Sequence, residues 1–254
     1  TAKELYEEGG DLIVFDGVEA QRSSEMKLIE RGAPVYKIAL KNGMTHKVTS
    51  YHKVKTSLGD VACKDLKLGD RVCIQTNKGI FGDLSMEDEA FLLGLYQADG
   101  TQHRDLIMID IWEQDFDLLD EIKERFDRVH YKYGCDKYEI RNTHGEAIGS
   151  RARLPADWCE QNTGASAVRK KRLSAKTLSK ALRFSKGDIP EWVWRSNEAT
   201  QWQYLRGLFY ADGSVSLGSS IGNPISLSIC NIDRAFLEQL QLLMRNLGLN
   251  ATLY

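Results

Sequence analysis

One nine-residue pattern occurs twice in this chain of 254 residues, at residues 92–100 and 205–213. The two copies share Leu, Gly, Leu, Ala, Asp and Gly at the same offsets, 113 residues apart. Small residues stand four apart in each copy, and they are Gly94, Ala98, Gly207 and Ala211. This spacing puts them on one face of a helix, so two such helices can approach closely. The chain is therefore predicted to pair two like helices from a duplicated unit.

The last residue but one of each copy is acidic, Asp99 in the first and Asp212 in the second. Parallel packing by pseudo-twofold symmetry would bring both carboxylates to the C-terminal ends of the helices, where the helix dipole disfavours negative charge. A second carboxylate adds repulsion, which a divalent cation would relieve. Asp-Gly is also a common helix stop, but its occurrence in two matched copies favours a metal site for phosphoryl chemistry.

The remainder of the chain divides into two regions. Residues 12–15, 35–40, 48–56 and 71–76 have the pattern of short strands, with turns at Gly17, 42–43 and 59–60. Residues 85–88 have the form of a capping box that opens a helix, so a domain boundary is expected near Gly82. Beyond it a helix, strand, strand, helix order repeats, with strands at 106–111, 215–217 and 225–230 and amphipathic helices at 114–129 and 233–247.

Charge and cysteine content narrow the class of protein. The net charge of -2 hides a segregated distribution, because residues 151–186 hold ten basic and two acidic residues. Such a run suits a nucleic-acid partner or a solvated helix face. The five cysteines are odd in number and form no C-x-x-C pair, which argues against a disulfide framework and a zinc site. An intracellular, non-secreted protein with no membrane span is expected.

The duplicated segments resemble the paired motifs of the LAGLIDADG homing endonucleases, over roughly residues 85–254. The resemblance implies that the last acid of each motif, Asp99 and Asp212, holds the metal and acts in catalysis. The earlier acid of the family pattern is replaced by Gln97 and Tyr210, at a position that varies in the family. It also implies a saddle of two antiparallel sheets that lies over a DNA duplex.

Basic residues near the motifs are candidates for contact with DNA. Residues 186–190 resemble the Lys-x-x-Ile-Pro block that precedes the second motif in intein-borne members. The resemblance makes Lys186 a catalytic candidate that would stabilise charge on the phosphate. The alternative is that Lys186 is a surface lysine in a basic loop. Residues 130–141 would suit a strand that faces DNA. The expected DNA-binding residues are Lys132, Lys137, Arg141, Arg169, Lys170, Lys171 and Arg172.

The N-terminal region resembles the Hint domains of inteins. Residues 43–56 resemble the Thr-x-x-His block, and residues 64–72 resemble the Asp-Leu-x-x-Gly-Asp strand entry that follows it. The resemblance implies that Thr49 and His52 assist the first step of protein splicing. His46 is the less suitable histidine, because Thr49 stands three residues before His52. Because the chain opens at Thr1 and lacks a terminal His-Asn pair, either it extends at both ends or splicing has been lost.

The predicted fold is α+β. A β-rich, partial Hint-like domain over residues 1–82 precedes a pseudo-twofold, two-repeat LAGLIDADG domain of αββαββα order over 83–254. Repeat 1 is expected over about 85–165, a basic linker over about 166–190 and repeat 2 over about 191–254.

The predicted function is site-specific cleavage of double-stranded DNA at an intein-less allele. The cofactor would be Mg²⁺, with Mn²⁺ as an alternative, and the partners would be duplex DNA and host exteins in cis, with the protein a monomer. The alternatives are a cleavage-inactive DNA binder or maturase, and an intein whose only live activity is splicing.

Overall fold

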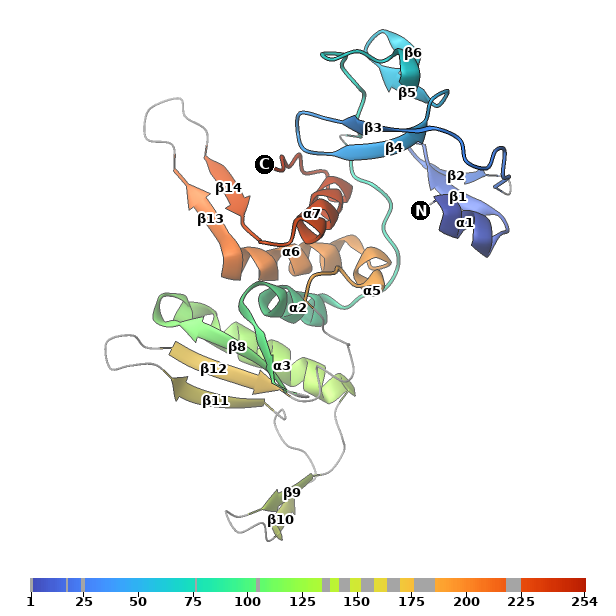
Figure 1. The fold of residues 1–254 in the computed structure, drawn as a ribbon. Coiled ribbons are helices and arrows are strands. Elements are labelled where there is room, and N and C mark those ends of the chain that lie inside the picture. Colours follow the sequence, from blue (N-terminus) through green and yellow to red (C-terminus); the bar gives the residue numbers. More distant parts are fainter. Residues whose placement is uncertain are drawn as a thin grey trace. The chain divides into compact units, whose positions relative to one another are not determined.

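The computed structural model divides the chain into two compact units, residues 1–80 with 237–254, and residues 81–236 (Figure 1). The structure describes residues 2–16, 18–23, 26–75, 77–103, 106–133, 138–141, 147–151, 158–163, 170–175, 186–217 and 225–254. Among the described helices, none combines the length and apolar character needed to cross a bilayer.

The first unit consists mainly of antiparallel hairpins, in which β1 pairs with β2, β3 with β4 and β5 with β6. The elements are α1 (Ala2–Glu8), β1 (Leu12–Phe15), β2 (Ala20–Ser23), β3 (Val35–Ala39), β4 (Thr45–Thr49), β5 (Lys53–Thr56), β6 (Gly59–Ala62) and η1 (Cys63–Asp65). Val48 and Cys63 are buried in this unit. The strands predicted at 12–15 and 35–40 are confirmed within one residue.

Two strand predictions in this unit are wrong. Residues 48–56 are not one strand, because a turn after Thr49 separates β4 from β5. Residues 71–75 form only an isolated bridge, Val72 with Thr56, where a strand was predicted over 71–76.

The last residues of the chain, which were predicted in the second repeat, group with the first unit. The amide nitrogen of Gln241 donates to the carbonyl oxygen of Asn42 over 2.7 Å, and a guanidinium nitrogen of Arg245 donates to that of Gln75 over 2.7 Å. Both side chains belong to helix α7 (Arg234–Asn246). These buried side chains donate to carbonyl oxygens of loops, and that of Asn42 also accepts from the backbone N–H of Leu253.

In the second unit, four strands form an antiparallel sheet in the order β11-β12-β8-β7. The elements are α2 (Glu87–Asp99), β7 (Thr101–His103), β8 (Leu106–Trp112), η2 (Glu113–Leu118), α3 (Leu119–Tyr133), β9 (Tyr138–Arg141), β10 (Ala147–Arg151), β11 (Trp158–Thr163), β12 (Lys170–Ala175), α5 (Glu191–Trp194), α6 (Glu198–Asp212), β13 (Gly213–Ser216) and β14 (Ser226–Ile229). The strand predicted at 106–111 is confirmed as β8.

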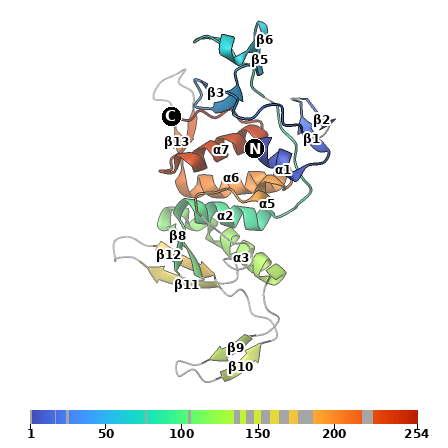
Figure 2. The ribbon, with the colours of Figure 1, turned by 45° about the vertical axis from the view of Figure 1, so that its right-hand side comes forward.

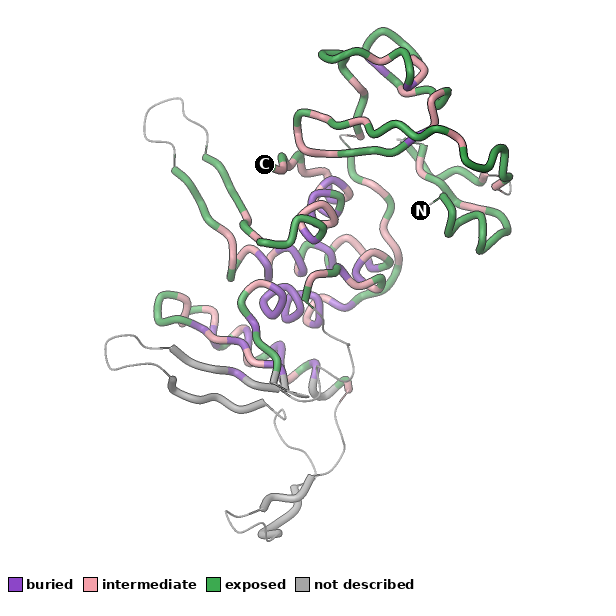
Figure 3. The backbone as a smooth tube through the Cα atoms, in the orientation of Figure 1, coloured by how far each residue is buried: buried purple, intermediate pink, exposed green. Residues whose placement is uncertain are grey.

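The core of this unit follows the expected periodicities. Alternate residues of β8, from Ile107 to Ile111, are buried, and so are residues of α3 at three- and four-residue spacing, among them Ile122 and Phe126. Helix α2 is buried without interruption from Glu89 to Gln97, because α3 and α6 both pack against it (Figures 1 and 3). It is therefore a central helix and not a surface helix.

Three further expectations for this unit are corrected. Helix α2 begins at Glu87 after the N-cap Met86, so residues 85–88 do not form a capping box; the hydroxyl of Ser85 instead bonds the Glu87 carboxylate over 2.8 Å. Residues 170–175, expected within a basic linker, form β12, since their backbone pairs with both β8 and β11. Residues 130–133, expected in a strand, are the last turn of α3.

Candidate functional site at the paired helices

Helices α2 and α6 lie side by side (Figures 1 and 2). They touch through their motif glycines. A Cβ atom on Gly94 would meet the carbonyl oxygen of Tyr204, and one on Gly207 would meet the carbonyl oxygen of Phe91. Phe91 and Tyr204 are themselves 113 residues apart, so each helix presents the same residue position to the other. Only glycine allows the backbones this approach.

The remaining small residues of the motifs lie nearer the helix ends. Ala98 is half-buried and Ala211 is exposed. The close contact is therefore made by the glycines, and the helix surfaces are more open where the alanines stand.

The two helices run in the same direction. At their N-terminal ends the backbone N–H of Met86 donates to the Thr200 hydroxyl over 2.9 Å, and the Asn197 side chain donates to the Glu87 carboxylate over 3.3 Å. Asn197 also caps α6. Because the N-terminal ends meet and the middles touch, the C-terminal residues of the two helices end at the same side of the pair.

The motif aspartates and Lys186 interact electrostatically at this C-terminal end. Burial raises the pKa of Asp212, the charge of Asp99 raises it further, and Lys186 acts against both. Burial lowers the pKa of Lys186, although Asp99 and Asp212 both act to raise it. The Lys186 ammonium lies 5.6 Å from the ring centre of Tyr96. Two carboxylates and one amine therefore converge from α2, α6 and the loop before α5.

This cluster suits a hard divalent cation. Carboxylate oxygens are the protein ligands that Mg²⁺ prefers, and the cation usually keeps waters or phosphate oxygens as well. Burial and the charge of Asp99 raise the pKa of Asp212, and a bound cation would act against both. Among the described residues no group of three or more His, Cys, Asp or Glu side chains is placed to bind a metal. Asp99 and Asp212 would offer carboxylate oxygens to such a cation.

The predicted DNA-binding residues fall into different settings. Lys137 and Arg169 lie outside the described residues, and Arg141 is the last residue of β9. Lys132 lies on α3, and its ammonium forms a 2.6 Å ion pair with Glu89, whose side chain is 3 % exposed. The strand expected to carry Lys132 toward DNA is absent at that position, and the side chain compensates a buried carboxylate instead.

The basic segment of β12 belongs to the sheet. Lys170 pairs in register with Trp112, Lys171 with Ile111, and Arg172 with Asp110. Their backbone pairing with β8 and β11 places these residues in a strand of the sheet, where the sequence predicts a linker.

Thr49 and His52 are brought together by a turn in the first unit. The backbone N–H of His52 donates to the carbonyl oxygen of Thr49 over 3.1 Å, and His52 is exposed. Their role in splicing stays a prediction.

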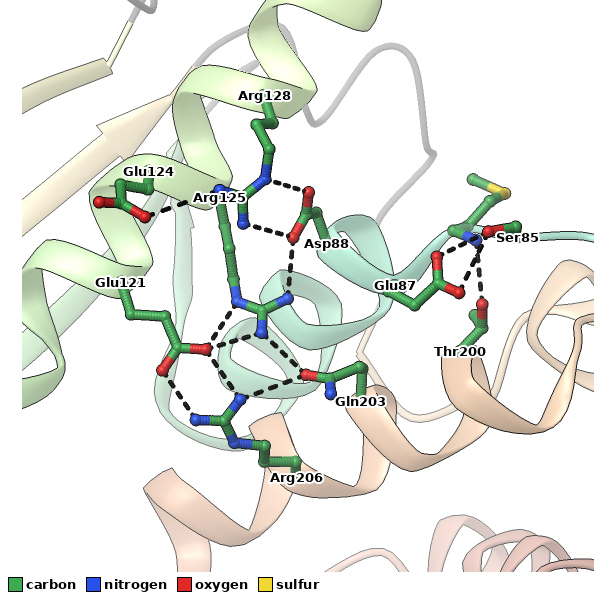
Figure 4. Close-up of polar contacts among 11 residues, drawn as sticks. Ser85, Glu87, Asp88, Glu121, Glu124, Arg125, Arg128, Thr200, Gln203 and Arg206 are labelled. Atoms are coloured by element: carbon green, nitrogen blue, oxygen red, sulfur yellow. Dashed lines mark hydrogen bonds and ion pairs between the residues drawn. The ribbon is translucent and has the colours of Figure 1, made fainter.

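An ion-pair network that no sequence motif singled out joins α3 to α2 and α6 (Figure 4). Arg125 bonds Asp88 over 2.8 Å, Glu121 over 2.7 Å and Gln203 over 2.9 Å, and Arg206 bonds the second oxygen of Glu121 over 2.7 Å. The spacing of Glu121 and Arg125, four apart on a helix, was the local signal for it.

The charges of this network are strongly compensated. Burial acts to raise the pKa of Asp88 and of Glu121, but hydrogen bonds from arginines outweigh it and hold both pKa values below their usual range. Arg125 and Arg206 also lie over the Phe91 ring, 4.4 Å and 5.2 Å from its centre. The network fastens α3 to both motif helices beside their contact.

The region that carries the second motif is similar to a known family of domains. Residues 199–254 match the LAGLIDADG-like domain. The match includes Gly207 and Asp212 of α6, together with β13, β14 and α7. In this LAGLIDADG-like domain, the motif helix is the one that pairs with α2.

Whole-chain similarities extend beyond the LAGLIDADG-like domain. The chain is 24 % identical over 272 aligned residues to the ribonucleoside-diphosphate reductase NrdEB subunit alpha of Bacillus subtilis (strain 168), and equally to that of Bacillus phage SPbeta. Each alignment covers 100 % of this chain, but the chain spans only 24 % of the length of these relatives.

Among solved structures, the homing endonuclease I-DmoI in complex with DNA and Mn is similar with a TM-score of 0.40 and 17 % identity, over 66 % of this chain and 81 % of that chain. I-DmoI in complex with DNA and Ca gives a TM-score of 0.39 and 17 % identity, over 65 % and 73 %.

Proposed function

We propose that this protein is a site-specific endonuclease that hydrolyses both strands of a DNA duplex with a divalent metal, Mg²⁺ or Mn²⁺. The observation that carries the proposal is the convergence of Asp99, Asp212 and Lys186 at one end of two parallel helices. The LAGLIDADG-like match over residues 199–254 supports it, since this segment contains the second of the two motifs.

Each residue of the cluster has a chemical task in this proposal. Asp99 and Asp212 present carboxylate oxygens as ligands, one from each helix. The cation, when bound, would neutralise phosphate charge and lower the pKa of a water molecule. Lys186 stabilises the negative charge that develops on the scissile phosphate. The glycine contact sets the separation of the carboxylates, because each aspartate stands five residues after its glycine on a rigid helix.

We further propose that β12 is part of the DNA-binding surface. Lys170, Lys171 and Arg172 would neutralise backbone phosphates, which gives affinity without sequence reading. Replacing the three with Gln should weaken binding to every duplex and flatten its dependence on salt. A single chain carries both motifs, so the proposed site is complete in a monomer that acts on intracellular DNA.

The host protein is proposed to be a ribonucleoside-diphosphate reductase alpha subunit, with this chain inserted as an intein. The support is an alignment that covers all of this chain and only 24 % of the reductase relatives. In this proposal Thr49 and His52 polarise the upstream splice junction. With the flanking residues restored, His52→Ala should block cleavage at that junction, and His46→Ala, on the exposed neighbouring strand, should not. Unimpaired splicing by His52→Ala would refute the assignment.

The test of the endonuclease uses a plasmid that carries the reductase alpha-subunit gene joined without this insertion. The full chain should linearise the plasmid with Mg²⁺ and leave it intact with EDTA. Asp99→Asn and Asp212→Asn should abolish cutting while DNA binding persists, and Asp117→Asn, an exposed aspartate of η2, should cut normally. Binding without cleavage in Mg²⁺ and in Mn²⁺ would overturn the proposal in favour of a cleavage-inactive DNA-binding protein.

A further inference from the structure

Gln97 joins three parts of the proposed site through one buried side chain. It lies on α2 two residues before Asp99 and is 4 % exposed. Its amide nitrogen donates to the backbone carbonyl oxygen of Asp188 over 2.7 Å, and its amide oxygen accepts a hydrogen bond from the hydroxyl of Tyr204 on α6. The carboxamide thus connects α2, α6 and the loop that follows Lys186.

The bond from Gln97 restrains the loop close to Lys186. The loop turns at Gly187, whose φ of 96° lies in the left-handed region, and Ile189 is buried with 5 % exposure. The carbonyl oxygen that accepts from Gln97 belongs to Asp188, which stands between the turn at Gly187 and the buried Ile189. A long lysine side chain has many rotamers, so fixing its backbone narrows where the ammonium can lie.

Tyr204 in turn orients Gln97. Tyr204 is fully buried, and burial raises the pKa of its hydroxyl, which stays a proton donor. With the amide oxygen bound to that hydroxyl, the amide nitrogen must face the loop.

The equivalent position in the second motif does not have this role. Tyr210 stands 113 residues after Gln97, is 40 % exposed, and contacts Arg206 and Phe91. The link to the Lys186 loop is therefore made from the first motif, by Gln97.

We propose that Gln97, oriented by Tyr204, is a positioning residue that holds the Lys186 loop against the Asp99–Asp212 pair. The inference rests on the proposed endonuclease function, to which it adds a residue that acts through Lys186 without touching DNA. Displacement of a catalytic group by about 1 Å can cost about a hundredfold in rate. Loss of the Gln97 bond should therefore slow cleavage by about tenfold to a hundredfold, with little change in DNA affinity.

A double-mutant cycle tests the inference on the same plasmid. Gln97→Met keeps the shape and removes both hydrogen bonds, and Lys186→Met removes the group to be positioned. Gln97→Met should reduce the single-turnover rate by about tenfold or more in the unaltered chain, and by less than about twofold in the Lys186→Met background. If Gln97→Met reduced the single-turnover rate by the same factor in both backgrounds, the role of Gln97 would be merely structural and the inference would be overturned. Gln201→Met, a buried glutamine at the other end of α6, is the matched control and should leave the cycle unaffected.

Amide hydrogen exchange gives a readout that does not need cleavage. Gln97→Met should speed exchange in peptides that cover residues 186–190 and leave the N-terminal half of α2 unchanged, and Tyr204→Phe should have the same effect to a smaller degree. Tyr204→Phe decides the matter if Gln97→Met fails to fold, and unchanged exchange in this loop overturns the inference. If the unaltered chain does not cut DNA, the endonuclease proposal is overturned. If it cuts, but Gln97→Met reduces the rate equally in both backgrounds, only the role of Gln97 is overturned.

Discussion

Substituting Gly94 by Ala tests the helix contact on which the proposed site depends. The added Cβ would lie 2.7 Å from the backbone nitrogen of Leu208 and closer still to the carbonyl oxygen of Tyr204. Neither backbone atom can rotate away, so α2 and α6 must separate by roughly 1 Å to regain ordinary van der Waals distances. Overpacking of this kind costs about 1–3 kcal/mol, and the higher helix propensity of Ala returns about 1 kcal/mol. We therefore expect urea denaturation to give a free energy of unfolding that is lower by up to about 2 kcal/mol.

The reciprocal geometry makes a sharper prediction for the pair of substitutions. A Cβ on Gly207 would lie 3.0 Å from the backbone nitrogen of Leu95 and would demand the same separation of the helices. Gly207→Ala should therefore cost less in the Gly94→Ala background than alone, by about 1 kcal/mol. The same separation should slow DNA cleavage in either single variant. Strict additivity, or stabilisation by Ala, would show that the helices do not meet at these glycines and would refute the reasoning.

Three further predictions concern charged side chains. Arg125→Met should lower the free energy of unfolding by about 2–4 kcal/mol at neutral pH. Because Asp88 has a lowered pKa, the part of this loss that comes from the Arg125–Asp88 pair should disappear as the pH falls below 3.8. A loss that does not depend on pH would contradict the network. Lys132→Met removes the cation that pairs with the buried Glu89, which keeps its hydrogen bond with Tyr133, and should lower the free energy of urea unfolding by about 2–4 kcal/mol; a loss below about 1 kcal/mol would mean that the pair is not needed. Asp212→Asn removes a carboxylate whose pKa is raised, so the metal-free variant should melt at a higher temperature than the unaltered chain at neutral pH. Added Mg²⁺ should raise the melting temperature of the unaltered chain and not that of the variant. An unchanged melting temperature of the variant in EDTA would contradict this.

Much of the local structure follows from short-range patterns. The apolar, β-branched run at 106–111 predicts β8. The three- and four-residue spacing of apolar side chains near Ile122 predicts α3, because that period reflects backbone geometry alone. The spacing of small residues likewise indicates that the motif helices can pack closely. The start of α2 was misjudged because the Met86 N–H bonds to Thr200, a residue distant in sequence.

The residues of the candidate site also differ in whether a local sequence pattern marks them. The repeat in the sequence singled out Asp99 and Asp212, and residues 186–190 singled out Lys186, because each belongs to a contiguous motif. Gln97 and the Arg125 network carried at most a weak local signal, since their partners lie on other elements. The ion pair of Lys132 likewise could not be read from its neighbours in the chain.

The sequence by itself determined the duplication, the glycine faces and the three residues proposed for catalysis, since each rests on residue type at fixed short spacing. Tertiary structure decided that β12 pairs with β8, that Lys132 compensates Glu89, and that Gln97 fastens the Lys186 loop. The physical reason is that the partner of a polar or charged group is chosen by which elements pack together. That choice depends on burial and desolvation across the whole unit, and no local pattern encodes it.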